Sequence, residues 1–171
     1  IPEEYIKKFK SDCLDKGYQR IISEKINEQE AFLVGKNQNK LVNIHGITRD
    51  VEAVLSSYSN SVVLIDFWAS WCAPCRQEMA FSKNFKKLYE RKKIHFLYFS
   101  IDTNSKDWKQ ANKEEALNES DSYLILNPLN AAIIKQNKIL SIPRYILIGK
   151  NKNTVFSDAP RPSDPKLKRL V

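Results

Sequence analysis

The segment Asp66-Phe67-Trp68-Ala69-Ser70-Trp71-Cys72-Ala73-Pro74-Cys75 is the most informative part of this chain. It continues an apolar run that begins at Ser61, and a run that is apolar on both faces is typical of a central strand covered on each side. The residues after the cysteines repeat at helical spacing and predict a long helix. The expected buried stripe of that helix consists of Phe81, Phe85, Leu88 and Tyr89. The two cysteines are therefore expected where a buried strand passes into a helix.

Further strands and helices alternate on the C-terminal side of this segment. The later strands are expected over residues 94–101, 123–126, 144–148 and 154–156. The later helices are expected to begin at Asn104 or Ser105, at Pro128 and at Asp164. This order predicts an α/β fold with a central mixed β-sheet flanked by helices.

Residues 1–42 are expected to form an N-terminal extension, and residues 43–171 the α/β domain. Apolar residues at helical spacing predict two helices in the extension, and the run over residues 31–34 predicts a short strand. Cys13 falls on the apolar stripe of the first of these helices, so we interpret it as a buried, inert thiol.

The chain has 171 residues, which is enough for one domain with an ordinary core. Its net charge of +8 would suit a nucleic-acid binder. The basic residues are nevertheless scattered among acidic ones without an aromatic-rich ribbon, so no nucleic-acid partner is expected. No stretch reaches the ~18 apolar residues that span a bilayer. The chain begins at Ile1 without a secretory signal, which leaves open an export signal or a membrane anchor upstream.

The spacing of Cys72 and Cys75 suits thiol–disulfide exchange. Exchange needs a thiolate that a partner's disulfide can reach, and a second thiol close enough to resolve the mixed disulfide. Two cysteines three residues apart at the start of a helix lie on one face, and the free N–H groups there stabilise a negative sulfur. Pro74 fits the first turn without losing a hydrogen bond. We assign Cys72 as the attacking nucleophile and Cys75 as the resolving thiol.

A Cys-x-x-Cys pair can also be half of a zinc site or a purely structural disulfide. A zinc site needs a second ligand pair, and the remaining candidates Cys13, His45 and His95 are not paired at metal spacing. A structural disulfide across so short a loop would add little stability. We therefore expect no metal, and the lack of a Gly-rich phosphate loop predicts no organic cofactor.

The cysteine segment closely resembles the active-site run of the thioredoxin-like superfamily. The following Arg76-Gln77-Glu78-Met79 resembles the TlpA/ResA-type branch. So does Leu140-Ser141-Ile142-Pro143, which is similar to the segment that carries the family's cis-proline. The tail over residues 159–163 is similar to that of many Bacteroidetes members. The resemblance covers residues 43–171 and implies a thioredoxin fold, with the N-terminal extension outside it.

The resemblance also implies roles for two acids beside the redox pair. Asp66 matches the buried acid beneath the disulfide, which would take and return the proton of Cys75 during resolution. A carboxyl inside an apolar strand is expected to have a raised pKa, although the position also fits a satisfied polar group of the core. Glu78 matches an acid one turn after Cys75 that could tune that thiol. The alternative for Glu78 is a plain solvent-facing helix residue.

The client-binding positions implied by the resemblance are Trp71, Ala73, Pro74, Ile142 and Pro143. Pro143 matches the cis-proline that faces the disulfide, and the backbone of Ile142 would pair with the client chain. An ordinary trans proline in a turn is the alternative. Trp71 would lie at the rim of this surface and Trp68 against the core. Arg144 stands where the family commonly has Thr, which leaves the choice of client open.

We predict a thiol–disulfide oxidoreductase that exchanges disulfides with protein clients as a reductase or isomerase. The resemblance implies the periplasm or cell envelope, clients such as cytochrome c apoproteins or misoxidised secreted proteins, and electrons from a membrane donor of the DsbD type. The direction is open, because such pairs span roughly −270 to −120 mV. A thiol peroxidase would need a Thr-x-x-Cys setting, which the chain lacks. The remaining alternative is a non-enzymatic redox-sensing or protein-binding thioredoxin-like module.

Overall fold

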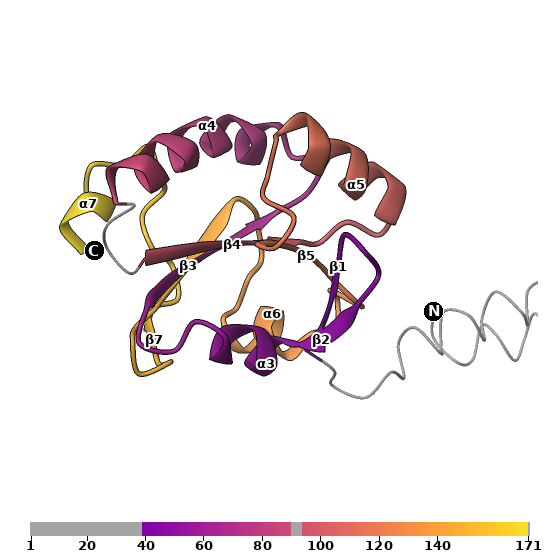
Figure 1. Ribbon diagram of the computed structural model, residues 1–171, viewed down its shortest axis with the longest axis horizontal. Helices are drawn as coiled ribbons and strands as arrows, with labels where there is room; N and C mark the ends of the chain where they lie inside the picture. Colours follow the sequence, from indigo (N-terminus) through magenta and orange to yellow (C-terminus); the bar gives the residue numbers. More distant parts are fainter. Residues whose placement is uncertain (1–38, 90–93, 171) are drawn as a thin grey trace, which may run out of the picture. The chain divides into compact units, whose positions relative to one another are not determined.

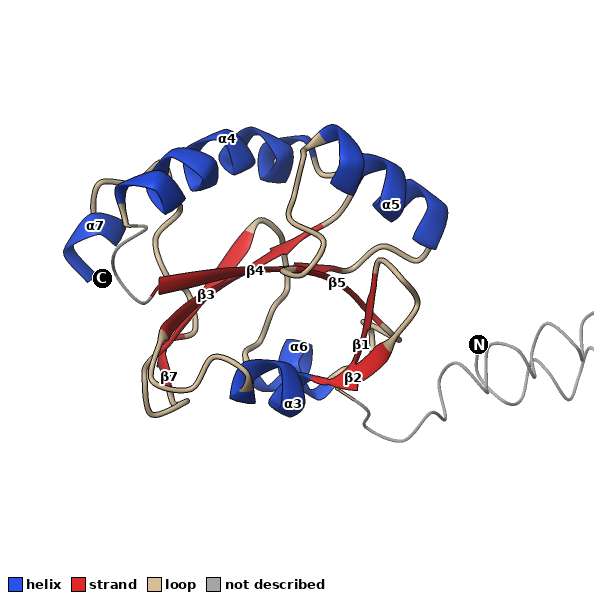
Figure 2. Cartoon of the chain, in the orientation of Figure 1, coloured by secondary structure: helices blue, strands red, loops and turns tan. Residues whose placement is uncertain are grey.

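One mixed β-sheet organises the part of the chain that the structure describes (Figures 1 and 2). The structure is a computed structural model, and it describes residues 39–89 and 94–170. The strands are β1 Lys40–Asn43, β2 Thr48–Asp50, β3 Val62–Trp68, β4 Ile94–Ser100, β5 Ser122–Ile125, β6 Arg144–Ile148 and β7 Thr154–Phe156. The helices are α3 Val51–Ser56, α4 Ala73–Leu88, α5 Ser105–Glu114, α6 Ala132–Gln136 and α7 Leu167–Leu170. Among these described helices, none is both long and apolar enough to cross a membrane.

The central strands run parallel, and the outer ones are antiparallel to their neighbours. The spatial order is β2-β1-β5-β4-β3-β6-β7. β3, β4 and β5 are parallel, whereas β1 pairs antiparallel with β5, and β6 pairs antiparallel with β3. The carboxyl ends of the three parallel strands therefore meet at one edge of the sheet, and the segments that contain Trp71, Thr103 and Leu129 follow them. Ligands of open α/β sheets generally bind at such an edge.

Side chains along β3 alternate between two layers of the core. Leu64 and Trp68 pack in the layer that includes residues of α4 and α5, whereas Ile65 and Phe67 pack with residues of α3 and α6. Figure 1 shows α4, α5 and α7 on one side of the sheet and α3 and α6 on the other. By this alternation Asp66 faces the same side as Leu64 and Trp68, beneath the helix that begins at the cysteines.

The expected α/β fold with a central mixed sheet is confirmed, and the β6–β7 hairpin has the predicted bounds. The predicted buried stripe of α4 is wrong in part, because Phe81 is 50% exposed and Leu88 is 67% exposed. The buried residues of α4 are instead Cys75, Glu78, Met79, Ser82 and Phe85. Cys75 faces the core, so the residues three and four positions further along are buried with it, whatever their polarity.

The sheet also takes in residues that the sequence assigned to the N-terminal extension. β1 starts at Lys40, and its pairing with β5 leaves Leu41 fully buried. That burial explains why Lys40–Val42 join the sheet. The helices and strand predicted over residues 6–34, and Cys13 with them, lie outside the described residues.

The helix expected to open at Pro128 begins four residues later. Asn127 has a left-handed φ of 56°, and its carbonyl oxygen accepts hydrogen bonds from the N–H groups of Asn130 and Ala131. Pro128 therefore lies in a turn, and α6 starts only at Ala132.

Candidate redox site

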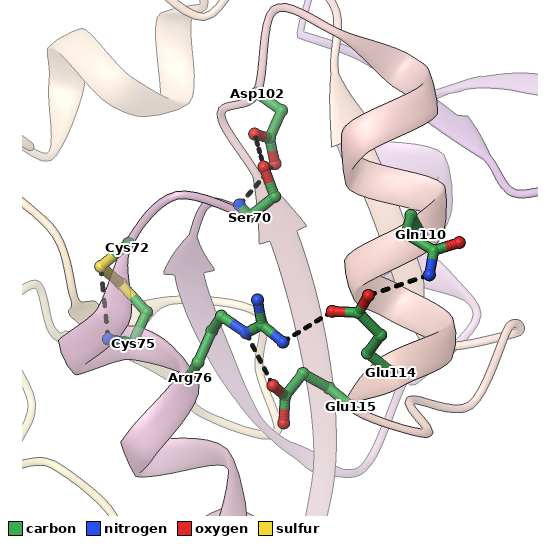
Figure 3. Close-up of polar contacts among 8 residues, drawn as sticks. All are labelled: Ser70, Cys72, Cys75, Arg76, Asp102, Gln110, Glu114 and Glu115. Atoms are coloured by element: carbon green, nitrogen blue, oxygen red, sulfur yellow. Dashed lines mark hydrogen bonds and ion pairs between the residues drawn. A yellow bond between two sulfur atoms is a disulfide. The ribbon is translucent and has the colours of Figure 1, made fainter.

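Cys72 and Cys75 lie at the start of α4, just beyond the carboxyl end of β3 (Figure 3). Cys72 has an extended backbone and forms the N-cap of the helix, and the N–H of Cys75 donates to Cys72 Sγ at 3.3 Å. The two sulfur atoms are joined in a disulfide. Pro74 occupies the first turn, where its missing N–H removes no helical hydrogen bond. The sulfur of Cys72 therefore lies where helix N–H groups and the helix dipole stabilise a thiolate.

The two cysteines differ in how far they can be reached from solvent. Cys72 is 5% exposed, whereas Cys75 is fully buried. The neighbouring Trp71, Ala73 and Pro74 are exposed, so Cys72 lies at the surface of the motif and Cys75 behind it. This arrangement agrees with Cys72 as the attacking sulfur, since only an accessible thiolate meets a client disulfide.

Asp66 lies in the middle of β3 and is fully buried. Its register partners on the two neighbouring strands are Tyr98 of β4 and Tyr145 of β6. Among the described residues, neither carboxyl oxygen of Asp66 has a hydrogen-bond partner, and neither does the hydroxyl of Tyr145. The reading of Asp66 as a satisfied polar group of the core therefore does not fit the described contacts.

Burial raises the pKa of Asp66 well above its ordinary value of 3.8. The hydroxyl of Tyr145 opposes this shift in part by favouring the carboxylate, although it lies outside hydrogen-bonding geometry, and the charge of Glu78 raises the pKa further. Burial also raises the pKa of Tyr98 and of Tyr145, so both phenols stay neutral. Asp66 consequently holds a proton at pH values where an exposed aspartate has lost it.

Glu78 is buried on α4, one turn after Cys75, and is held by the C-terminal segment. Its Oε2 accepts a hydrogen bond from the N–H of Ser163 at 3.0 Å, and its Oε1 accepts one from the Ser163 hydroxyl at 2.7 Å. The alternative of a solvent-facing helix residue is thereby excluded. Two acids, Asp66 and Glu78, therefore lie under the first turns of α4. Among the described residues, Glu78 accepts hydrogen bonds and Asp66 accepts none.

The loop that enters the cysteine motif is fixed by Asp102, which follows β4 (Figure 3). Asp102 Oδ2 accepts from the Ser70 N–H at 2.9 Å, and Oδ1 accepts from the Ser70 hydroxyl at 2.6 Å. Ser100 donates a third bond from its hydroxyl to Oδ2 at 2.7 Å. The buried Asp102 carboxylate therefore holds the backbone two residues before Cys72 in place.

Arg76 joins α4 to the end of α5 through two ion pairs (Figure 3). Its Nε lies 2.7 Å from Glu115 Oε1, and a terminal nitrogen lies 2.8 Å from Glu114 Oε2. Gln110 donates a further hydrogen bond to Glu114 at 2.9 Å. Two separate carboxylates hold the planar guanidinium, which fixes the first turn of α4 against α5.

A groove lies beside the redox pair at the carboxyl edge of the parallel strands. We call it the α6 groove; its lining includes Trp71, Leu129, Lys135, Lys138, Leu140 and Ile142. The volume of the groove is about 990 Å³. Ile142 and Pro143 are half-buried, and the peptide bond between them is cis. Trp71 is 68% exposed whereas Trp68 is fully buried, in agreement with the positions that the family resemblance implies for the two indoles.

Three contacts of the site were missed by reasoning from the sequence: Ser70 with Asp102, Ser163 with Glu78, and Arg76 with the acids of α5. A signal for the first existed, because Ser70 and Asp102 each follow a predicted buried strand, and the ends of neighbouring parallel strands meet. The hydrogen bond between Ser163 and Glu78 joins residues 85 positions apart, and no local sequence pattern predicts it.

Within residues 39–89 and 94–170, no group of three or more His, Cys, Asp or Glu side chains is placed to hold a metal ion. The chemistry available at the site is that of its two sulfurs, with Asp66 and Glu78 as the nearby acids.

The sequence and the structure are both similar to known thiol–disulfide oxidoreductases. The family described as "Thioredoxin-like" matches residues 60–154, more than half of the chain. ResA, a thiol-disulfide oxidoreductase of Bacillus cereus, is 22% identical over 129 residues, which cover 75% of this chain and 71% of the relative. A thioredoxin of Coprinus comatus is 38% identical over 47 residues, and this match spans only 44% of that protein.

Two solved structures from Bacteroides share the fold over most of their length. A Bacteroides vulgatus protein assigned as a thiol-disulfide oxidoreductase has a TM-score of 0.65 and 32% identity, and the match covers 77% of this chain and 87% of that one. A thiol-disulfide oxidoreductase of Bacteroides fragilis has a TM-score of 0.61 and 29% identity, with coverage of 77% and 96%. The chain therefore belongs to the thioredoxin-like family, in the TlpA/ResA-type branch of thiol–disulfide oxidoreductases, with Cys72 and Cys75 as its CxxC pair.

Proposed function

We propose that this protein reduces or isomerises disulfides of protein clients through Cys72 and Cys75. The single observation that carries the proposal is the asymmetry of the pair. Cys72 caps α4 at the surface of the motif, and Cys75 is fully buried behind it. One sulfur can therefore meet a client, and the other is protected until the first reaction has placed a mixed disulfide beside it.

In the first step the reduced protein attacks the client disulfide. The Cys72 thiolate, stabilised by the N-terminus of α4, attacks one sulfur of the client disulfide. A bond forms between Cys72 Sγ and that sulfur, the client S–S bond breaks, and the second client sulfur leaves as a thiolate that takes a proton from water.

In the second step Cys75 resolves the mixed disulfide. Asp66, once it has released its own proton, takes the proton of the Cys75 thiol as a carboxylate, and Cys75 Sγ then attacks Cys72 Sγ. The bond to the client breaks, the client sulfur leaves as a thiolate that takes a proton from water, and two electrons have passed from the protein to the client. The raised pKa of Asp66 supports its role as the proton acceptor. Glu78, held as a hydrogen-bond acceptor by Ser163, would set the charge near Cys75.

Clients would dock on the surface formed by Trp71, Ala73, Pro74, Ile142 and Pro143. The exposure of Trp71 and the apolar α6 groove beside it support this role, because exposed apolar patches mark interaction sites. The backbone of Ile142 would pair with an extended client segment.

The reductase cycle needs a supply of electrons. We propose a membrane donor of the DsbD type, and action in the periplasm or cell envelope, with a membrane anchor outside the sequence considered. The resemblance to TlpA/ResA-type proteins supports these assignments. Labelling of Cys72 in intact cells with a membrane-impermeant maleimide tests the location, and protection of Cys72 until lysis would contradict it.

The reduction potential distinguishes the two directions. The protein is equilibrated in glutathione or dithiothreitol buffers, and its Trp fluorescence is followed, with Cys72→Ala as the control. A midpoint below about −240 mV would indicate a reductase fed by a donor, and one above about −180 mV an oxidase or isomerase. A signal that does not titrate, or that titrates unchanged in Cys72→Ala, would contradict the redox assignment.

Turnover separates the enzyme from a redox-sensing module. Cys75→Ser is expected to accumulate a mixed disulfide with a disulfide-bonded peptide, because the resolving thiol is lost. Cys72→Ala is expected to form none. Mass spectrometry under non-reducing conditions measures both, and equal adducts on the two variants would overturn the assigned roles.

A further inference from the structure

The lining of the α6 groove has an apolar part and a positively charged part. Together they indicate the kind of ligand that would bind there. We propose that it selects clients in which a large apolar side chain lies beside the attacked disulfide and acidic residues lie close by. This inference rests on the proposed function, and it names the class of client that the same site would take.

The apolar part of the groove consists of large apolar side chains that are mostly exposed to solvent, although such side chains are usually buried. Trp71 is 68% exposed, Leu129 is 73% exposed and Leu140 is 94% exposed. Isolated exposed leucines need no explanation, but these three residues line one groove, and Ile142 lies in the same lining. An aliphatic or aromatic side chain placed here would remove apolar surface from water on both partners.

The charged part of the groove is positive. Lys135 and Lys138 are its only charged lining residues, and both are exposed. Lys135 donates a hydrogen bond to the side chain of Asn130 at 2.8 Å. In the part of the chain that the structure describes, neither lysine forms an ion pair with a carboxylate. A negatively charged segment would therefore complement the two lysines of the groove.

The groove is continuous with the reacting sulfur. Trp71 is adjacent to Cys72 in the chain, and Ile142 directly precedes Pro143. When a client disulfide reacts with Cys72, the client residues next to that disulfide would therefore lie beside Trp71 and in the groove. A polypeptide supplies both the cysteine and its flanking side chains, so a peptide segment is the occupant that fits all three observations.

The test compares four peptides that each hold one intramolecular disulfide. They differ in the residue beside the attacked cysteine, Leu or Ser, and in a neighbouring run of three residues, all Glu or all Lys. Protein reduced with dithiothreitol and then desalted donates two electrons to each peptide, and stopped-flow Trp fluorescence gives the second-order rate constants. The Leu–Glu peptide is expected to react about tenfold faster than the Leu–Lys peptide at low salt. The difference should shrink near 0.5 M salt, where screening is effective beyond about 4 Å.

A matched control is needed because the net charge of +8 attracts any acidic peptide. The double variant Lys135→Glu and Lys138→Glu is expected to reverse the order of the Glu and Lys peptides. The double variant Lys150→Glu and Lys152→Glu changes the net charge equally, but its residues lie in the β6–β7 turn, at the opposite edge of the sheet. It is expected to keep the original order.

The apolar half of the proposal has its own variants. Leu129→Ser with Leu140→Ser is expected to lower the preference for the Leu peptide over the Ser peptide severalfold. Both side chains are exposed, so the fold does not depend on them. Leu88→Ser on α4, where the leucine is 67% exposed, is the control and should leave the preference unchanged.

The outcomes separate this inference from the proposed function. Reduction of all four peptides at one rate, or an order that survives charge reversal at Lys135 and Lys138, would overturn the selectivity and leave the oxidoreductase standing. If the wild type reduces no peptide, both proposals fail. Sedimentation of the wild type and of the Leu129→Ser, Leu140→Ser variant completes the test: a dimer that the substitutions dissociate would make the groove a self-interface and overturn the client assignment.

Discussion

Ser163 donates hydrogen bonds to both carboxylate oxygens of Glu78, at 3.0 Å from its N–H and at 2.7 Å from its hydroxyl. Glu78 lies one turn after Cys75 on α4, and Ser163 comes from the segment between β7 and α7. The C-terminal segment therefore fixes the position of a buried acid beside the redox pair, and the two ends of the contact can be tested separately.

Ser163→Ala is expected to destabilise the oxidised protein by about 1.5 kcal/mol, because a hydroxyl that donates to a buried carboxylate is lost. Urea unfolding followed by circular dichroism measures the change. Ser157→Ala, an exposed serine of the same segment, serves as the control and should change stability by less than about 0.5 kcal/mol. Equal effects of the two substitutions would mean that the contact to Glu78 contributes nothing of its own.

Glu78→Gln removes a negative charge near Cys75 while keeping the side-chain shape. A thiolate in the reduced protein is then opposed by one charge fewer, so the reduced form gains stability and the reduction potential should rise by about 30 mV. Equilibration with glutathione at several pH values measures the shift. A comparable rise in Glu119→Gln, an exposed acid whose Oε2 lies 3.3 Å from His45 Nε2, would show that the effect is not specific to the site.

Asp66→Asn is expected to change how stability depends on pH. Because the folded-state pKa of Asp66 lies above its ordinary value of 3.8, the folded protein keeps a proton that the unfolded chain releases. Stability from this group is complete below pH 4 and is lost as the pH rises toward the folded-state pKa. Asn does not titrate, so the stability of the variant relative to the wild type should increase as the pH rises above 4.

Urea midpoints of the oxidised protein between pH 5 and pH 8 test this prediction. The control is Asp107→Asn, an exposed acid in the first turn of α5, whose stability should run parallel to that of the wild type. A constant difference between wild type and Asp66→Asn across the range would contradict the raised pKa. The variant should also resolve the mixed disulfide about a hundredfold more slowly if Asp66 accepts the proton of Cys75.

Asp102→Ala is expected to cost about 3 kcal/mol of stability, because three hydrogen bonds to a buried carboxylate are lost and their donors are left without it. The loop at Ser70 loses its anchor, so the reaction of Cys72 with a peptide disulfide should slow as well. Asp102→Asn retains an acceptor for one donor and should fall between Ala and the wild type. Thermal unfolding and stopped-flow fluorescence measure the two effects; unchanged reactivity in a destabilised Asp102→Ala would limit Asp102 to a structural role.

The sequence predicted those parts of the molecule whose signals are local. The run that ends at Trp68 is apolar on both faces because β3 is covered on both sides, and the β6–β7 hairpin is bounded by its turn residues. The cysteine pair and Asp66 were found because a motif of ten consecutive residues contains all three.

Other parts depend on contacts between residues far apart in the chain. Phe81 was expected in the core, yet it is half exposed, because the face of α4 is set by Cys75 and Glu78 and not by the largest apolar side chains. The anchoring of Ser70 by Asp102 crosses 32 positions. Such pairings follow from how strands and tails are arranged in space, which periodicity and composition do not encode.

The position of β3 in the sheet also bears on how the protein folds. Its two neighbours come from residues 94–100 and residues 144–148, so one of its pairings must close a loop of roughly eighty residues. Such non-local pairings slow folding, because loop-closure entropy is lost before the contacts form. The cysteine motif is synthesised before Ile142 and Pro143, which belong to the proposed client surface. Recovery of peptide-disulfide reduction after denaturation should therefore follow the last closure of the sheet, and not the earlier formation of α4.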